Sequence, residues 1–140
     1  MRATRTTRER VAELELRPPV FSPGQATLRQ VARTLWAEGV GVLLVGEPDE
    51  PVGIISERDV VARLAAGADP DSTTAAQAMT EAVICAGPDD LLFEVAGQML
   101  DNAVRHVPVT DGTDRISGVV SMRDLLRPLL LDAASNDRAT

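Results

Sequence analysis

Two stretches of this chain carry the apolar stripe of an amphipathic helix, at an offset of 64 residues. Apolar positions at i, i+3, i+4, i+7 and i+8 form one continuous helix face that can pack against a core. The pattern therefore predicts one helix over residues 28–36 and another over residues 92–100. The two stripes consist of Leu28, Val31, Ala32, Leu35 and Trp36, and of Leu92, Val95, Ala96, Met99 and Leu100.

Segments rich in Val, Leu and Ile surround each predicted helix in the same order. A short strand-like segment precedes the helix, and two longer ones follow it with turn-forming residues between them. A second short helix completes each copy, over residues 57–65 and 122–131. The predicted strands lie at 20–21, 39–45 and 52–56 in the first copy, and at 83–85, 103–109 and 116–121 in the second.

The chain thus consists of two strand–helix–strand–strand–helix repeats. One such unit buries little surface alone, whereas two units can cover each other's sheets. We expect an α/β (α+β) domain with pseudo-two-fold symmetry and two related clefts between the repeats. The expected segments are a flexible basic tail over 1–13, repeat 1 over 14–66, a linker rich in Gly, Pro, Asp, Ser and Thr over 67–75, repeat 2 over 76–131, and a flexible tail over 132–140.

Composition narrows the class of protein. Aromatic residues are scarce, with one Trp, two Phe and no Tyr, so the core must be aliphatic. The net charge is −7 and all 14 basic residues are Arg; an acidic body argues against nucleic-acid binding, which needs a basic face.

No apolar run reaches the ~18 residues that suggest a membrane span. The opening residues also lack the apolar core of a signal peptide, so we expect a cytoplasmic protein. The single cysteine, Cys85, can form no internal disulfide, and we expect it to be buried in a strand.

The last strand of each copy ends in a repeated pattern, G-I-I-S-E-R-D at 53–59 and G-V-V-S-M-R-D at 118–124. Ser-x-x-Asp at a strand-to-helix junction predicts a capping box, in which the Ser hydroxyl accepts from the amide three residues later. This structural role needs no ligand. The same geometry also suits a nucleotide, because a hydroxyl and helix amides can donate to phosphate while a carboxylate accepts from two ribose hydroxyls. Arg58 and Arg123 would add positive charge.

The two copies resemble a tandem pair of CBS domains, named after cystathionine β-synthase and also called a Bateman module. The resemblance rests on the two heptapeptides, on R-H-V-P-V at 105–109 and on A-M-T at 78–80, and it covers about residues 14–131. The first copy departs from the pattern, because residues 16–17, Leu-Arg, stand where residues 79–80 have Met-Thr. The resemblance implies a regulatory module that binds AMP, ADP, ATP or S-adenosylmethionine in the clefts between the repeats and signals by a conformational change. It implies no required cofactor.

The resemblance also implies roles for individual residues. Asp59 and Asp124 would hold ribose hydroxyls, and the serine three residues before each would contact phosphate. An apolar slot around Val20 and Val83 would take the adenine, and residues of R-H-V-P-V would face the phosphates. The candidate ligand-binding residues are therefore Ser56, Arg58, Asp59, Ser121, Arg123, Asp124, Arg105, His106, Pro108, Val20 and Val83.

The two copies are chemically unequal. The second carries Arg105 and His106 where the first has the uncharged Gly41 and Val42. Charge alone therefore favours the cleft with Asp124 for a phosphorylated ligand, while the other cleft would hold adenosine, the same nucleotide or nothing. His106 has an alternative role as a packed or capping side chain. No metal site is expected, because the chain has no second His.

We expect a homodimer that forms through the helices at 57–65 and 122–131 and acts on a separate downstream protein, with no nucleic-acid or membrane partner. The alternative is a ligand-free module of the same fold that works by protein–protein contact or dimerisation. No enzyme is expected, because one His, one Cys and no Lys leave no catalytic triad, and no phosphate-cradling Gly-rich loop is present. The side chains expected at the dimer surface are Val60, Val61, Leu64, Leu125, Leu126, Leu129 and Leu130.

Overall fold

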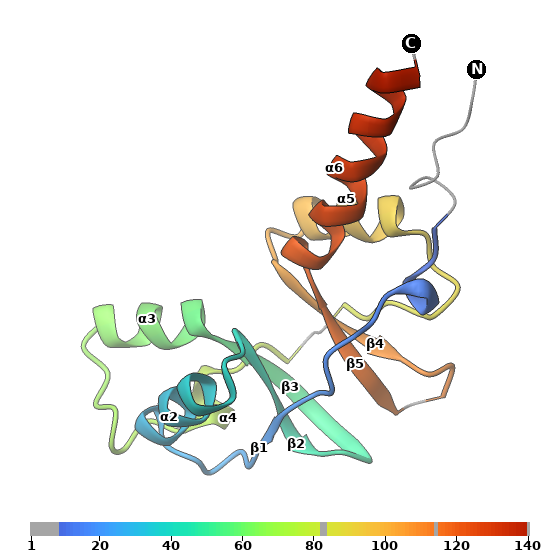
Figure 1. Cartoon of the computed structure of the whole chain (residues 1–140). Helices are drawn as coiled ribbons and strands as arrows, with labels where there is room; N and C mark the ends of the chain where they lie inside the picture. The colour runs from blue at the N-terminus through green and yellow to red at the C-terminus, as the bar shows by residue number, and fades with distance from the viewer. Residues whose placement is uncertain (1–8, 82–83, 114, 140) are drawn as a thin grey trace. The chain divides into compact units, whose positions relative to one another are not determined.

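The computed structural model describes residues 9–81, 84–113 and 115–139, which form two compact units (Figure 1). The first-repeat unit contains residues 19–81, and the second-repeat unit contains residues 9–18 together with residues 84–139. Each unit combines a β-hairpin with helices, so the mixed α/β class predicted from the sequence is confirmed.

The first-repeat unit is built on a three-stranded sheet in the order β1-β2-β3. Strand β1 runs parallel to β2, and β3 runs antiparallel to it. Helix α2 begins at a capping box between Thr27 and Gln30 and ends at Gly39, whose positive φ of 64° suits glycine. Its elements are β1 (Phe21–Ser22), α2 (Leu28–Glu38), β2 (Val42–Glu47), β3 (Glu50–Ser56), α3 (Glu57–Ala65) and α4 (Ala75–Ala78). Its core consists of Leu28, Val31, Leu35, Leu43, Val45, Ile55, Val60, Ala75 and Ala78.

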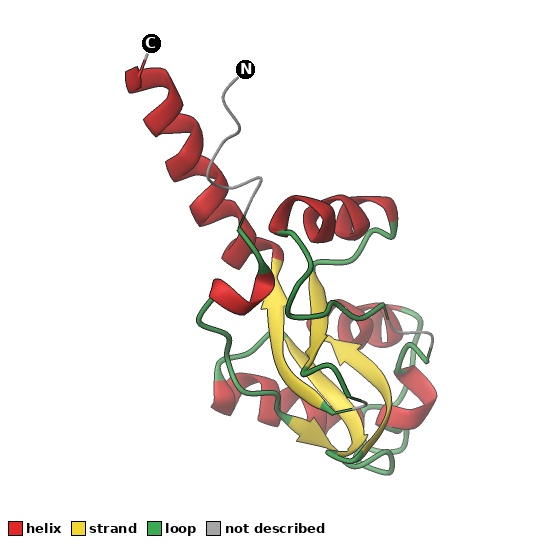
Figure 2. Ribbon diagram, turned by 90° about the vertical axis from the view of Figure 1, so that its right-hand side faces the viewer, coloured by secondary structure: helices red, strands yellow, loops and turns green. Residues whose placement is uncertain are grey.

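The second-repeat unit has the same plan with a shorter sheet, in which β4 pairs antiparallel with β5. Figure 2 shows its last helix as one continuous element that runs to the C-terminus. Its elements are η1 (Val11–Glu13), α5 (Leu92–Asp101), β4 (His106–Thr110), β5 (Ile116–Ser121) and α6 (Met122–Ala139). Its core consists of Val11, Ala86, Leu92, Val95, Met99, Val107, Val109, Val120 and Leu125.

The free edge of each hairpin is paired with the segment that leads into the other repeat. In the first-repeat unit, Ile54 and Thr80 exchange two backbone hydrogen bonds of 3.0 and 2.9 Å. In the second-repeat unit, the N–H of Val119 donates to the carbonyl of Arg17 at 3.4 Å. The chain therefore leaves the second-repeat unit after residue 18 and returns to it at residue 84.

A glycine allows the close approach of each lead-in segment. A Cβ on Gly53 would lie 2.6 Å from Met79 Sδ, and a Cβ on Gly118 would lie 2.9 Å from Leu16 Cβ. Both distances are too short for a side chain, so these positions need glycine for packing rather than for an unusual backbone angle. The equivalence of residues 16–17 and 79–80 that the sequence suggested is thus reproduced in the packing.

The structure differs from the expected segments at three places. Val11 is completely buried and its N–H donates to the Asp90 carbonyl at 2.9 Å, so residues 9–13 are folded, while residues 1–8 lie outside the described part. The expected linker is part of the first-repeat unit, since Thr74 bridges to Thr27 and caps α4, where Ala75 is buried. Helix α6 continues through the expected C-terminal tail to Ala139, because the residues beyond Leu131 include no Gly or Pro to end it.

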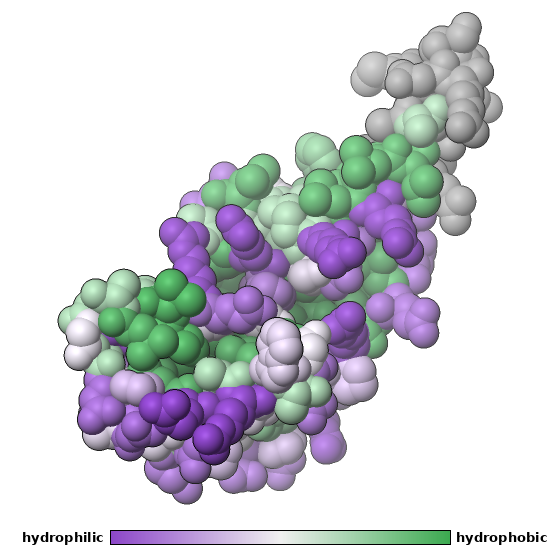
Figure 3. All heavy atoms as spheres, turned by 60° about the vertical axis from the view of Figure 1, so that its left-hand side comes forward, coloured by the Kyte–Doolittle hydropathy of each residue, from purple (hydrophilic) through white to green (hydrophobic). Residues whose placement is uncertain are grey.

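The buried face of the two long helices is narrower than the predicted stripe. Trp36 at the end of α2 is 89% exposed, and Leu100 at the end of α5 is 74% exposed. The i, i+3 and i+7 positions of each stripe are buried in the core, and Ala96 at the i+4 position of α5 packs against it in part, whereas the i+8 position of each stripe turns away. Apolar side chains consequently gather on the surface seen in Figure 3.

The helices expected to carry a dimer surface, α3 and α6, also have both buried and exposed apolar side chains. Val60 and Leu125 belong to the two cores, so placing them on the surface was wrong. Leu129 is partly buried against the core of its unit. The exposed large apolar side chains on the helices are Trp36, Val61, Leu64, Phe93, Leu100, Leu126, Leu130 and Leu131.

Candidate functional site

Ser56 and Asp59 form a reciprocal capping box at the start of α3. The Ser56 N–H donates to Asp59 Oδ2 at 2.8 Å, and the Asp59 N–H donates to Ser56 Oγ at 3.2 Å. The Ser56 hydroxyl also donates to the same Asp59 Oδ2 at 3.0 Å. The capping role predicted from Ser-x-x-Asp is confirmed here.

Ser121 and Asp124 repeat this arrangement at the start of α6. The Ser121 N–H donates to Asp124 Oδ2 at 2.8 Å, and the Asp124 N–H donates to Ser121 Oγ at 3.1 Å. The two serine hydroxyls differ in what they donate to. Ser56 Oγ donates to Asp59, whereas Ser121 Oγ donates to no group in the described part of the chain. Asp124 is exposed, whereas Asp59 is partly buried.

Both capping boxes leave one carboxylate oxygen available. All the hydrogen bonds to Asp59 and Asp124 side chains end on Oδ2, and Oδ1 of each accepts none from the described residues. A carboxylate can accept about four hydrogen bonds through its two oxygens. Each Asp can therefore keep its helix cap and still accept from an external hydroxyl group.

The strand register decides which side chains neighbour each box. Val42 lies opposite Ser56, and His106 lies opposite Ser121. The strand-to-helix junction has the same backbone hydrogen bond in both copies. The N–H of Glu57 donates to the Gly41 carbonyl, and the N–H of Met122 donates to the Arg105 carbonyl. Within one unit, the structure thus places His106 opposite Ser121 and the backbone of Arg105 at the start of α6. Arg105 is exposed and His106 is partly buried.

Pro108 changes the opening strand of the second copy. In the first copy the N–H of Leu44 donates to the Val20 carbonyl at 2.9 Å, and β1 pairs with β2. Pro108 occupies the equivalent position and has no N–H, so this hydrogen bond has no counterpart. The opening strand predicted over 83–85 is reduced to a single bridge between Ala86 and Val109.

The pairing of the opening segments with β2 and β4 decides which residues are equivalent at the expected adenine slot. Val20 is partly buried, and its carbonyl accepts from the N–H of Leu44 in β2. Val83 lies outside the described residues. Ala86 pairs with Val109 as Ser22 pairs with Val45, so Ile84, rather than Val83, is the register equivalent of Val20.

Cys85 does not have the environment expected for it. It is exposed, and it lies outside any strand because Pro108 has no N–H to pair with the residue before Cys85. Partial burial of the thiol nevertheless raises the pKa of Cys85. The cysteine is therefore accessible but poorly ionised at neutral pH.

The arginines of the heptapeptides lie on the first turns of α3 and α6, where Arg58 and Arg123 are both exposed. They occur in both copies and so add the same charge to each box.

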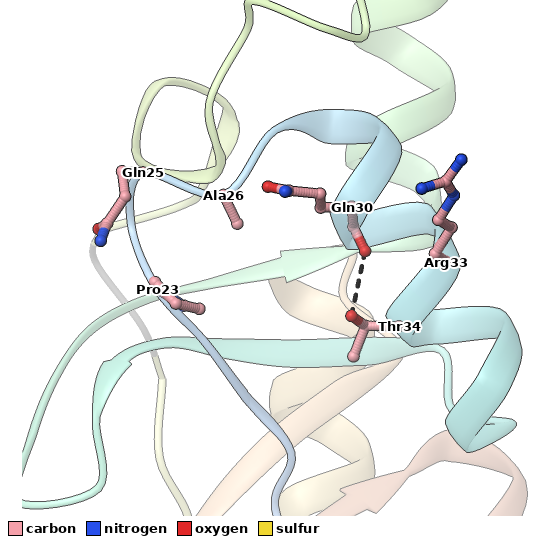
Figure 4. A pocket seen from close by; sticks show the side chains of 6 residues that line it. All are labelled: Pro23, Gln25, Ala26, Gln30, Arg33 and Thr34. Atoms are coloured by element: carbon pink, nitrogen blue, oxygen red, sulfur yellow. Dashed lines mark hydrogen bonds between the residues drawn. The ribbon is translucent and has the colours of Figure 1, made fainter.

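The first-repeat unit also has an open pocket of about 450 Å³, between the β1–α2 loop and α2 (Figure 4). Its lining consists of Pro23, Gln25, Ala26, Gln30, Arg33 and Thr34.

This pocket escaped the sequence reasoning because its residues form no recognisable motif. Its lining includes no carboxylate that could accept from ribose hydroxyls. Gln30 Oε1 is occupied by the Thr27 N–H at 2.9 Å, and the Thr34 hydroxyl donates to the Gln30 carbonyl at 3.0 Å. The capping boxes therefore offer the better chemistry for a nucleoside.

Among the described residues, no group of three His, Cys, Asp or Glu side chains could hold a metal ion. Over the same residues, no helix combines the length and the apolar character that crossing a membrane requires.

Comparison with known proteins connects these features to a family. The model of the CBS domain matches residues 11–66 and again residues 75–131. The uncharacterised protein MK0525 of Methanopyrus kandleri is 33% identical over 119 residues, which cover 84% of this chain and 61% of that protein. The chain thus spans about three-fifths of the length of this relative.

Two solved structures resemble the chain closely. The CBS domain protein PAE2072 from Pyrobaculum aerophilum, complexed with AMP, is 34% identical with a TM-score of 0.80, over 91% of this chain and 99% of that one. The CBS domain pair of protein MJ0100, in complex with 5′-methylthioadenosine and S-adenosyl-L-methionine, is 27% identical with a TM-score of 0.76, over 85% and 98%.

Proposed function

Because this chain belongs to the CBS domain family and carries two copies of the domain, we propose that it is a regulatory module that binds an adenosine-containing ligand. The observation that carries the proposal is the repeated Ser–Asp capping box, with Oδ1 of Asp59 and of Asp124 left available. The AMP held by one relative, and the two adenosine compounds held by another, support ligands of the same class here. Binding would change the conformation of the module and so signal to a separate downstream protein.

Each capping box would recognise the sugar. Oδ1 of Asp59 and Oδ1 of Asp124 would accept hydrogen bonds from the vicinal ribose hydroxyls, while Oδ2 remains engaged in the helix cap. Hydrogen bonds to a charged acceptor are about twice as strong as neutral ones, so a carboxylate suits this role. Apolar residues at the opening strands, such as Val20, would pack against the adenine.

Calorimetric titration with AMP, ADP, ATP and S-adenosylmethionine tests this proposal. Asp59→Asn and Asp124→Asn each replace one carboxylate oxygen with an amide group that can no longer accept there. We expect each change to weaken binding at its own site by about tenfold or more, because a hydrogen bond to a charged group contributes about 1.5–3 kcal/mol.

Glu57→Gln is the matched control, since Glu57 is an exposed carboxylate in the first turn of α3 and caps nothing. It should leave affinity unchanged. Thermal unfolding of each variant separates lost affinity from a weakened helix cap. The proposal fails if the unaltered protein binds none of the four compounds, or if both Asp variants bind them as tightly as it does.

We further propose that two copies of the chain associate through the exposed apolar faces of their helices. Soluble proteins expose few contiguous apolar surfaces, and larger ones mark interaction sites. Leu130 on α6 is 66% exposed, and Trp36 on α2 is exposed still further. Trp36→Gln and Leu130→Gln should each lower the mass measured by light scattering toward that of the monomer.

Val52 provides the control, because it is a half-exposed apolar residue on β3 rather than on a helix. Val52→Gln should leave the mass unchanged. A monomeric unaltered protein would rule out this association. The same apolar helix faces favour a second candidate function, a ligand-free module that acts by contact with other proteins, and it would be supported if the chain dimerises but binds no adenosine compound.

A further inference from the structure

We propose that two copies of this chain associate head to tail, with α2 of one copy packed against α5 of the other. This inference rests on the association proposed above and adds to it which helices pair. The two helices occupy equivalent places in the two repeats, but their outward faces differ in charge. Each face therefore fits the other better than it fits a copy of itself.

The outward face of α2 is basic and carries an exposed tryptophan. Arg29, Arg33 and Trp36 lie at i, i+4 and i+7, which places them along one exposed side of the helix. Arg29 already pairs with Asp71 at 2.6 Å, whereas Arg33 forms no salt bridge with any described residue. The acidic residue of α2, Glu38, lies about 140° around the helix from Arg33. This basic face of α2 thus offers an unpaired guanidinium group next to a large exposed ring.

The outward face of α5 combines apolar side chains with carboxylates. Phe93 and Leu100 lie seven residues apart on one side of the helix and are 64% and 74% exposed. Glu94 and Asp101 stand beside them with the same spacing, and neither forms a salt bridge with a described residue. Helix α5 contains no basic residue. This acidic face of α5 therefore has both the apolar surface and the charge that complement the basic face of α2.

Packing the basic face against the acidic face of a second copy satisfies both. Trp36 would cover Phe93 and Leu100, and the Arg33 guanidinium group would pair with a carboxylate beside them. Buried apolar surface supplies affinity in such a contact, and opposite charges at its rim decide which surfaces pair.

Pairing like with like lacks this complementarity. Two α2 helices would bring Arg33 next to a second Arg33, and two α5 helices would gather four carboxylates, and like charges oppose both contacts. The whole chain carries a net charge of −7, so two copies repel each other except where local charges are opposite. A second copy of this chain is therefore the partner that fits the basic face of α2.

Cross-linking of single-cysteine variants tests which helices face each other. Cys85→Ser removes the only native cysteine, and Ala37→Cys or Gln98→Cys then places one thiol on an exposed side of α2 or of α5. With a short bis-maleimide, we expect a covalent dimer when the two variants are mixed and allowed to exchange subunits, and little from either variant alone. Efficient cross-linking of Ala37→Cys with itself would overturn the inference, and so would a dimer that gives no covalent product in the mixture.

Charge reversal gives an independent test by analytical ultracentrifugation. Arg33→Glu and Glu94→Arg should each raise the Kd of the dimer by about tenfold, because each replaces an attraction with a repulsion and a two-fold symmetric dimer makes the contact twice. Both changes in one chain should restore most of the affinity. Arg115→Glu, which reverses an exposed arginine between β4 and β5, is the control and should leave the Kd unchanged.

The outcomes separate this inference from the association itself. A double variant that dimerises no more tightly than the single variants overturns the head-to-tail pairing, even though the unaltered protein is a dimer. A monomeric unaltered protein overturns the association and the pairing together. Thermal unfolding of each variant distinguishes a lost contact from a lost fold.

Discussion

Replacing Gly53 with alanine tests the close packing of the lead-in segment against β3. The added Cβ would lie 2.6 Å from Met79 Sδ and 2.8 Å from the Thr80 carbonyl oxygen. The flexible Met79 side chain can move aside. The Thr80 carbonyl cannot, because Thr80 is held to Ile54 by two backbone hydrogen bonds.

The size of the effect follows from these contacts. Either the strand pair stays together under strain, at a cost of about 1–3 kcal/mol for overpacking, or it separates and loses two hydrogen bonds of about 1 kcal/mol each. We therefore expect Gly53→Ala to lower the free energy of unfolding by about 2 kcal/mol. A domain is stable by only about 5–15 kcal/mol in total, so this loss is readily measured.

Urea unfolding followed by circular dichroism measures this free energy. Gly97→Ala is the matched control, because Gly97 lies inside α5 and an added Cβ meets no atom within 4 Å. The same substitution there should stabilise the protein by about 0.5–1 kcal/mol. If Gly53→Ala is as stable as the unaltered protein, the lead-in segment is not packed against β3 as described.

Three further changes test other parts of the structure. Val11→Ala should lower the free energy of unfolding by about 2 kcal/mol through a cavity in the core, whereas Glu15→Ala on the exposed part of the same segment should have little effect; equal stabilities would mean that residues 9–18 are not docked. The hydrogen bond and charge of Arg29 lower the pKa of Asp71. The ion pair therefore adds stability above the unfolded-state pKa of the carboxyl group and loses it as the pH falls through the folded-state value. A titration by NMR should show the pKa of Asp71 rise in Arg29→Gln, and an unchanged value would contradict the pairing. Burial raises the pKa of Cys85, so iodoacetamide should react more slowly with the folded protein than with the urea-unfolded one at neutral pH; equal rates would contradict this environment.

The features that the sequence predicted correctly depend on residues close together in the chain. A capping box joins residues three apart, so Ser56 with Asp59 and Ser121 with Asp124 could be recognised from the letters alone. The two long helices and the hairpins follow from apolar periodicity in the same way. Duplication strengthened each assignment, since an independent copy of the pattern lay about 64 residues away.

The errors arose where a distant part of the chain decides the outcome. Whether Trp36 faces the core depends on how far the packing surface extends around α2, and periodicity cannot specify that width. Cys85 lies outside a strand because Pro108, more than twenty residues later, has no N–H to pair with its segment. Val11 is buried by α5 and by the turn before it, so its polar neighbours in the sequence gave a misleading impression of a tail.

The amino-acid sequence by itself therefore determined that this protein has two CBS repeats, and which residues cap the helices at the junctions. Only the tertiary structure decided that each lead-in segment pairs with the hairpin of the other repeat, through Thr80 beside Ile54 and Arg17 beside Val119. The physical reason is that a strand edge offers unpaired N–H and C=O groups to any segment that can reach it. Local patterns identify such an edge, but the partner is selected by the folded path of the whole chain.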